Sequence, residues 1–366
     1  MGGDLVSPVV NKDRSVTFNF RSERAEKVEI AGEFRLGRRV VGPGAPVASV
    51  PMEKVSDDVW TYTTEPVPPG IYRYTFVVDG MRVLDPLNPW RRYHRMQPMS
   101  MVEVKGEEPM PWDHLPQIAH GTVVIEKFYS EVLGQMKSCA IYLPPGYWTA
   151  EKRFPVLYLL HGGGDDYSSW VFDGNADNIM DCLISKGKSK EIVVVMPDGQ
   201  VISLEERMRL ASLRGRASAM RRVIRSMVSE RHLNYFVEEL MPFVESKYHV
   251  YKEQRAIAGL SMGAAQTLNL ITFHPDMFIA AGMFSSGPAE KARKRLPLVK
   301  DKIELLKMIY ISCGDWDSIL ENSRTLDRLL EELNVPHIYV EGDGGHIWPF
   351  WQRSLIDFVT RLSRIL

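Results

Sequence analysis

The sequence has 366 residues, 45% of them hydrophobic, and this length exceeds what one hydrophobic core usually serves. Lys and Arg total 45 against 46 Asp and Glu, so the formal charge of -1 gives no electrostatic reason to expect nucleic acid or an anionic membrane as a partner. No run approaches ~18 uncharged apolar residues, as a membrane span would require. The cysteines are too scattered for a disulfide framework or a zinc site, so we expect buried thiols at Cys139, Cys182 and Cys313 and two soluble globular domains.

The first 105 residues have the pattern of a β domain. Short alternating runs such as "SVTFNF", "KVEIAGEF" and "YRYTFVVDG" are broken by Gly, Pro and Asp, and none has a helical period. We expect a small β-sandwich here, and a linker over 106–117, where Pro, Gly and charge interrupt every periodicity. The aromatic residues of this part alternate as core residues would, so no sugar-stacking platform can be picked out among Trp60, Tyr62, Tyr72, Tyr74 and Phe76.

Residues 118–366 alternate strands with helices. "FPVLYLLHG", "EIVVVMPDG" and "RAIAGL" are continuous apolar strands, and helices are expected near 318–333 and 348–362. A further helix, in "HLNYFVEELMPFVESKY", should kink at Pro242. This pattern predicts an α/β domain with a mostly parallel sheet covered on both faces.

Ser261 lies in "GLSMG", between a predicted strand that ends at Leu260 and a helix that begins near Met262. This is the context of a nucleophile elbow, in which flanking glycines let the strand and the helix approach closely. The alternative is a helix-capping serine at a tight turn. We expect Ser261 to be the nucleophile.

A nucleophilic serine needs a histidine base and an acid, which follow it in the order Ser, Asp or Glu, His in α/β-hydrolases. "YISCGDWD" ends a later strand with Asp315 and Asp317, and these two are equal candidates by position. His346 follows the last strand in "EGDGGH", just before the final helix, and is the predicted base. Asp343 is a weaker candidate for the acid because it shares the loop that it would have to orient.

Two backbone N–H groups should stabilise the oxyanion of the tetrahedral intermediate. One is expected from Met262, directly after the nucleophile, and the other from "HGGG", where we choose Gly163. His161 is expected to pack beneath this loop. The predicted chemistry is acyl transfer through an acyl-enzyme, and it requires neither a metal nor another cofactor.

With these residues placed, 118–362 resemble carbohydrate esterase family 1, the esterase D-like group of feruloyl and acetylxylan esterases. The likeness runs through "FPVLYLLHGGGDDYSSW", "RAIAGLSMGAAQTLNL", "ISCGDWD" and "GGHIWPFWQRSL". It implies an α/β-hydrolase fold, and it selects Asp317 as the acid and Gly163 as the second oxyanion donor. Residues 14–104, with "VWTYTTEPVPPGIYRYTFVVDG" before "DPLNP", resemble the immunoglobulin-like family 48 carbohydrate-binding module that precedes such esterases. This module is expected either to bind polysaccharide or only to buttress the rim of the active site.

The sequence departs from that family at two places. Gly263-Ala264-Ala265 stands where the family usually has a further glycine, and 205–231 carry eight arginines and no lysine in place of a shorter segment. This arginine-rich segment is either a solvated helical excursion or a lid that binds substrate carboxylates. Trp170 and Trp348 are expected to stack on an aromatic acyl group or a sugar, whereas Trp351 should anchor the final helix.

The sequence therefore predicts a serine carboxylesterase that releases ferulate from feruloylated xylan or its oligosaccharides. An acetylxylan esterase and an enterochelin-type siderophore triester esterase are the alternatives, and a carbohydrate-binding protein with an inactive hydrolase domain is disfavoured because all three triad residues are present. If "MGG" is not native, a removed signal would favour secretion, and otherwise an intracellular enzyme is expected. No pattern predicts the oligomeric state.

Overall fold

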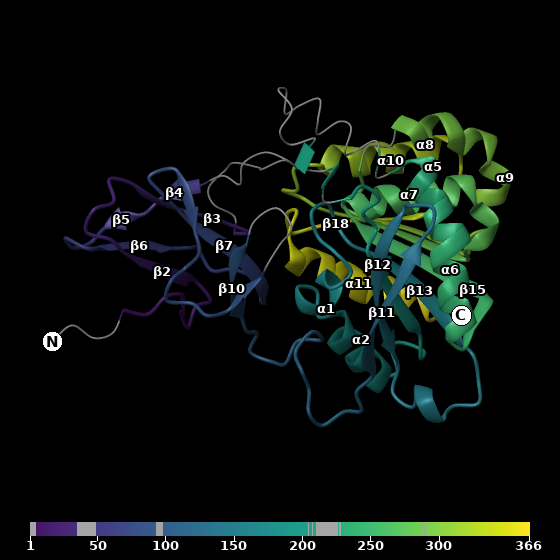
Figure 1. Ribbon diagram of the computed structural model, residues 1–366, viewed down its shortest axis with the longest axis horizontal. Coiled ribbons are helices and arrows are strands. Elements are labelled where there is room, and N and C mark those ends of the chain that lie inside the picture. Colours follow the sequence, from purple (N-terminus) through teal and green to yellow (C-terminus); the bar gives the residue numbers. More distant parts are fainter. Residues whose placement is uncertain are drawn as a thin grey trace. The chain divides into compact units, whose positions relative to one another are not determined.

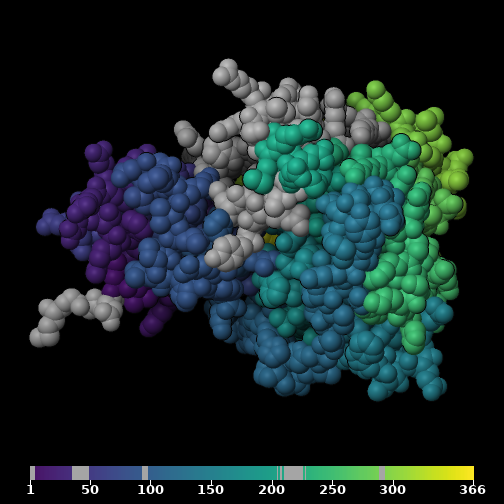
Figure 2. Space-filling view, viewed as in Figure 1, coloured from purple at the N-terminus to yellow at the C-terminus, as the bar shows by residue number. Residues whose placement is uncertain are grey.

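The computed structural model describes residues 5–34, 49–92, 98–203, 205–206, 208–209, 226, 228–287 and 290–366. Contacts divide the chain into two compact units. Unit 1 contains residues 1–110 together with two short later segments, Trp316–Ser318 and Asp343–Phe350, and unit 2 contains the remainder. The described residues from 5 to 110 are coloured purple to blue in Figures 1 and 2, and those of unit 2 continue from blue to yellow.

Unit 1 is built from two antiparallel sheets, with the strand orders β1-β2-β6-β5 and β4-β3-β7-β10-β9, and with β8 paired to β7. Side chains of β2 are buried at alternate positions, as expected when one face of a strand lies on a core. The Phe18 ring of β2 lies 4.6 Å from that of Tyr74 on β7, so the two sheets pack face to face, which fits a β-sandwich. The strands are β1 (Val9–Val10), β2 (Val16–Arg21), β3 (Val28–Gly32), β4 (Ser49–Pro51), β5 (Glu53–Lys54), β6 (Val59–Thr63), β7 (Gly70–Val78), β8 (Met81–Val83), β9 (Arg91–Arg92) and β10 (Met99–Val104).

The aromatic side chains that alternate along this part of the sequence form its core. Trp60, Tyr72, Tyr74 and Phe76 are buried, and Tyr62 is half-buried. The expectation that most of them are structural is confirmed.

Unit 2 contains an eight-stranded sheet of order β11-β12-β14-β13-β15-β16-β17-β18. The sheet is mixed, which corrects the prediction of a mostly parallel one. The strands β11 and β12 form a hairpin closed by Gly134 at φ 64°, and β12 also runs antiparallel to β14, whereas the strands from β14 to β18 pair in parallel. The strands are β11 (Thr122–Ser130), β12 (Gln135–Leu143), β13 (Phe154–Leu160), β14 (Val193–Pro197), β15 (Val250–Leu260), β16 (Ala280–Phe284), β17 (Met308–Gly314) and β18 (Ile338–Gly342).

The central strands are buried on both faces. In β16, Met283 belongs to the same core cluster as Leu268 of α7, whereas the ring of its neighbour Phe284 lies 5.9 Å from that of Phe358 in α11. Because successive side chains of a strand point to opposite faces, helices cover both sides of this sheet, as predicted. The helices are α1 (Ser169–Phe172), α2 (Ala176–Ser185), α5 (Glu230–Asn234), α6 (Met241–Lys247), α7 (Met262–Phe273), α8 (Glu290–Arg295), α9 (Lys300–Ile303), α10 (Leu320–Glu332) and α11 (Trp348–Leu362).

The helical segment around Pro242 is irregular. A π-helical stretch, Tyr235–Leu240, joins α5 to α6 and ends two residues before this proline. Because proline has no N–H to donate to the preceding turn, the wider helical register is a way to accommodate it, and the kink at Pro242 stays a prediction.

The three cysteines are buried and free, as predicted. Among the described residues, no helix has both the length and the apolar character needed to cross a membrane.

Candidate active site

Ser261 occupies a sharp turn between β15 and α7 in unit 2. Its backbone has φ 53° and ψ -107°, a conformation that is unfavourable for a residue with a Cβ atom. The two glycines of the motif permit the turn, because a Cβ added to Gly259 would lie 2.5 Å from the carbonyl carbon of Gly263. The strand-turn-helix context predicted from "GLSMG" is therefore present, with the strain that exposes a nucleophile in an elbow.

The turn lies at the carboxyl end of the parallel strands. The amide of Ser261 donates to the carbonyl of Phe284, the last residue of the neighbouring strand β16, at 2.8 Å. In sheets of this kind, ligands bind at the carboxyl ends of the strands. Ser261 thus lies at the edge of the sheet where a substrate is expected.

The glycine-rich loop after β13 lies beside this turn. A Cβ built on Gly162 would lie 3.8 Å from the Cβ of Ser261, and one on Gly163 would lie 3.9 Å from the Cβ of Met262. The structure therefore brings together the predicted nucleophile and the two residues predicted to donate to the oxyanion.

His161 is buried beneath this loop, as expected, and its tautomer follows from its partners. Its Nδ1 lies 2.7 Å from the carbonyl oxygen of Gly162, which can only accept, while its Nε2 accepts from the amide of Gly199 at 3.0 Å. The imidazole is therefore neutral and protonated at Nδ1. This ring cannot serve as a base at Nδ1, and it fixes the orientation of the peptide that precedes Gly163.

The loop after β14 is hydrogen-bonded both to the start of the glycine-rich loop and to helix α7. The carbonyl of Gly199 accepts from Gln266 of α7 at 2.9 Å, and Asp198 forms a buried ion pair with Lys137 at 3.2 Å. Lys137, which is 2% exposed, also donates to the carbonyl of Gln200 at 2.6 Å. Sequence reasoning missed this support, because Lys137 lies in β12 and Asp198 follows β14, and nothing in the sequence pairs the two.

The predicted acid and base form a hydrogen-bonded pair within unit 1. Nδ1 of His346 lies 3.0 Å from Oδ2 and 3.1 Å from Oδ1 of Asp317. The Asp317 side chain is fully buried, whereas that of His346 is 22% exposed. Between the two aspartates that the sequence left as equal candidates, Asp317 is thus the one that contacts His346.

The segments that carry this pair are packed against each other. The amide of Trp316 donates to the carbonyl of Gly344 at 3.1 Å, and a Cβ on Gly345 would lie 2.1 Å from the Trp316 ring. Only glycine fits at position 345 with the indole in this place. The residue before Asp317 thus fixes the residue before His346.

The two tryptophans predicted to contact substrate are buried, and this prediction is wrong. Trp170 is 0% exposed, donates to the carbonyl of Leu160 at 3.0 Å and packs on Phe284. Trp348 is 1% exposed, with the guanidinium of Arg73 over its ring. Neither indole presents a face on which a sugar or an aromatic acyl group could stack. Trp351 is buried and donates to Ser285 at 3.0 Å, as expected of a helix anchor.

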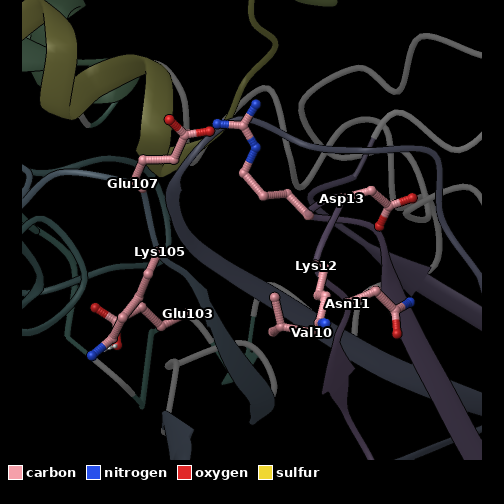
Figure 3. Close-up of a pocket in the computed structure, with 9 residues that line it drawn as sticks. Val10, Asn11, Lys12, Asp13, Glu103, Lys105 and Glu107 are labelled. Atoms are coloured by element: carbon pink, nitrogen blue, oxygen red, sulfur yellow. Dashed lines mark ion pairs between the residues drawn. The ribbon is translucent and has the colours of Figure 1, made fainter.

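Unit 1 also contains a charged pocket of about 560 Å³, shown in Figure 3. It lies where the end of β1 meets the end of β10, and none of its lining residues is aromatic. A stacking platform for sugars is therefore not found in this pocket. Its lining residues are Val10, Asn11, Lys12, Asp13, Arg14, Glu103, Lys105, Gly106 and Glu107.

Most of the arginine-rich segment 205–231 lies outside the described residues, so the choice between a lid and a solvated excursion stays a prediction. At its end, the side chain of Ser229 accepts from the amide of His232 and begins α5. Arg231 donates to the carbonyl of Leu133 at 2.7 Å.

His232, in α5, is a buried histidine that lies close enough to Lys137 to be affected by its charge. Burial, followed by the charge of Lys137, lowers the pKa of His232 to about 3. Neither of its ring nitrogens has a hydrogen-bond partner among the described residues. The unfolded chain takes up a proton at this residue below pH ~6.5 while the folded protein does not, so stability is lost as the pH falls from 6.5 towards 3.

His232→Phe should make the protein less sensitive to acid. Between pH 7 and pH 5 this one group should cost the wild type about 2 kcal/mol of unfolding free energy, and the variant should be spared that loss. Urea unfolding at the two pH values measures the difference, with His249→Phe, at an exposed position, as the control. Equal losses in the wild type and His232→Phe would contradict the expected linkage.

A sheet of parallel strands, extended by antiparallel ones and carrying a strained serine elbow, has the α/β-hydrolase fold. A model of the Esterase family matches residues 130–362. The chain belongs to this family and is a carboxylic ester hydrolase.

Two curated relatives extend beyond this chain. An endo-1,4-beta-xylanase/feruloyl esterase from Xylanibacter ruminicola is 30% identical over 362 residues, which cover 95% of this chain and 44% of that protein. An esterase of Mycobacterium tuberculosis is 31% identical over 172 residues, or 46% of this chain and 32% of that protein. The chain spans less than half the length of each.

Two solved structures share the fold. A ferulic acid esterase is 26% identical and superposes with a TM-score of 0.58 over 68% of this chain and 100% of its own. The enterobactin esterase of Shigella flexneri is 17% identical, with a TM-score of 0.70 over 96% of this chain and 93% of its own.

Proposed function

We propose that this esterase hydrolyses hydroxycinnamoyl esters, ferulate above all, on xylan or its oligosaccharides, with Ser261, His346 and Asp317 as its triad. The strained elbow at Ser261 carries the proposal of a nucleophile. The hydrogen-bonded pair of His346 and Asp317 supplies a base whose orientation is fixed. Ser261 belongs to unit 2 and the pair to unit 1, so their assembly into one triad is part of what we propose.

In the proposed reaction, Oγ of Ser261 attacks the ester carbonyl carbon while Nε2 of His346 takes its proton. Asp317 accepts from Nδ1 of His346 and stabilises the imidazolium. The N–H groups of Met262 and Gly163 donate to the oxyanion.

Collapse of the tetrahedral intermediate breaks the bond to the sugar oxygen, which leaves with the proton from His346. Water then attacks the acyl-enzyme, giving its proton to His346, and the second collapse frees the acid and returns the proton to Ser261. Every proton and electron pair is accounted for without a metal or a cofactor.

The ferulate assignment is supported by the relative from Xylanibacter ruminicola, whose name includes feruloyl esterase and whose match extends over 95% of this chain. The ferulic acid esterase structure supports it over the hydrolase part. We also propose that the β-sandwich of residues 1–105 is a carbohydrate-binding module similar to those of family 48. Residues 106–117 are then the linker between this module and the hydrolase domain.

A second candidate is a siderophore triester esterase. The specific observation in its favour is that the enterobactin esterase superposes on 96% of this chain, β-sandwich included, whereas the ferulic acid esterase covers 68%. At 17% identity this likeness shows a shared fold and leaves the substrate to experiment.

Chromatography of the products from three substrates tests the proposal: feruloylated arabinoxylan oligosaccharides, acetylated xylan and enterobactin. We expect free ferulate from the first, with Ser261→Ala as the blank. Acetate without ferulate would reassign the enzyme to acetylxylan, and hydrolysis of enterobactin alone would reassign it to siderophore esters. Activity on none of the three would overturn the proposed substrate class.

A further inference from the structure

The segment that carries His346 is packed on strand β7 within unit 1. Trp348 and Pro349 follow His346 by two and three positions, at the start of α11. A Cβ on Gly70, the first residue of β7, would lie 2.6 Å from Cγ of Pro349. The guanidinium carbon of Arg73, also on β7, lies 5.9 Å from the centre of the Trp348 ring. The segment after the predicted base is therefore held by residues from the first 110 positions.

Arg73 is itself held in a fixed orientation by Glu33. Its Nε and Nη2 donate to Oε1 of Glu33 at 2.9 and 2.7 Å, and its backbone N–H donates to Oε2 at 3.0 Å. The backbone N–H of Glu33 in turn donates to the carbonyl of Arg73 at 2.9 Å. The two side chains are only 12% and 11% exposed. A guanidinium fixed in this way cannot follow a moving indole, so it defines where the indole lies.

The residues on the other side of His346 are packed against the segment that carries Asp317. The Trp316 ring packs on Gly345, and the Trp316 amide donates to Gly344, so the residues before His346 are held beside Asp317, whereas those after it are held by β7. Displacement of Trp348 would therefore change the position of His346 relative to Asp317.

We propose that Arg73 is a positioning residue for His346, acting through Trp348, so that residues 1–110 belong to the catalytic machinery of this chain. This inference rests on the function proposed above, in which His346 is the base. A module that served only to bind polysaccharide would have no need of a largely buried ion pair directed at the residue two positions after the base. Catalysis requires the base within a few tenths of an ångström of its place, and a shift of ~1 Å can cost ~100-fold in rate.

The test uses the full chain and a small chromogenic ester, 4-nitrophenyl acetate, which contains no sugar and therefore does not report polysaccharide binding. Arg73→Met removes the guanidinium while keeping an apolar side chain of similar length, and Arg73→Lys keeps the charge. Gly70→Ala displaces Pro349 and leaves the ion pair with Glu33 intact. Arg21→Met is the matched control, since it breaks the ion pair of Arg21 and Asp58 in the same sandwich, where Arg21 is 59% exposed.

We expect Arg73→Met and Gly70→Ala to lower kcat about 10- to 100-fold with KM within about twofold of the wild type. The acid limb of their kcat/KM profile against pH should also shift, since that limb reports the base in the free enzyme. Arg73→Lys should recover part of the loss, and Arg21→Met should match the wild type. Thermal unfolding of each variant sets a temperature at which all are folded, and if Arg73→Met does not fold, Gly70→Ala and Arg73→Lys carry the test.

Wild-type kcat and an unshifted acid limb in both Arg73→Met and Gly70→Ala would overturn the inference. That result is distinguishable from a failure of the proposed function, in which Ser261→Ala would keep its activity. A loss in Arg73→Met that Arg21→Met shares to the same extent would also overturn it, because the effect would then be a general loss of sandwich stability.

Discussion

Ser261→Ala should lower kcat for ester hydrolysis by about four to six powers of ten while the protein stays folded. The substitution removes the attacking oxygen but keeps the Cβ, so the backbone strain at φ 53° is the same before and after. The remaining rate would come from substrate binding and from the donors to the oxyanion. Steady-state kinetics with 4-nitrophenyl acetate measure the loss, and thermal unfolding shows that the fold is kept.

Ser285→Ala is the matched control for this prediction. Ser285 has φ 51° directly after β16, the strand beside β15, but its hydroxyl is buried and accepts from Trp351. Its loss should lower stability by about 1 kcal/mol, because the indole N–H loses a buried partner, and kcat should stay within tenfold of the wild type. Substantial hydrolysis by Ser261→Ala would show that another group attacks the ester.

The features that the sequence predicts well are local. An elbow is determined by a few residues around Ser261, so the motif alone indicates the strained turn. The final helix is predicted at 348–362 and found as Trp348–Leu362, because its apolar residues follow a clear helical period. The order of the later motifs indicates His346 and narrows the acid to two aspartates, and the observed hydrogen bond favours Asp317.

The features that the sequence does not predict depend on packing between distant segments. Trp170 and Trp348 follow site motifs, but whether an indole is exposed depends on what covers it, and Arg73 lies far from Trp348 in the chain. The ion pair of Lys137 and Asp198 likewise joins β12 to the residue that follows the neighbouring strand β14. The antiparallel pairing of β12 with β14 was missed because apolar runs do not encode strand direction.

Gly263→Ala should destabilise unit 2 by about 3 kcal/mol or more and remove activity with it. A Cβ at this position would lie 2.6 Å from the carbonyl oxygen of Leu160 and 2.8 Å from that of His161. Both atoms belong to the backbone at the end of β13 or directly after it, so no side-chain rotation can relieve the clash. The start of α7 would have to move away from the sheet, taking with it the Met262 amide and the strained turn at Ser261.

Gly163→Ala is the control for this steric effect, because it replaces another glycine near the site at a position where a Cβ meets no close atom. The nearest atom to a Cβ at position 163 is the Cβ of Met262 at 3.9 Å, an ordinary van der Waals distance. Urea unfolding should therefore place Gly163→Ala within about 1 kcal/mol of the wild type, whatever its activity, and Gly263→Ala far below it. Equal stability of the two variants would mean that α7 can move away from β13 at little cost. Close contact with β13 would then not be the reason for glycine at position 263.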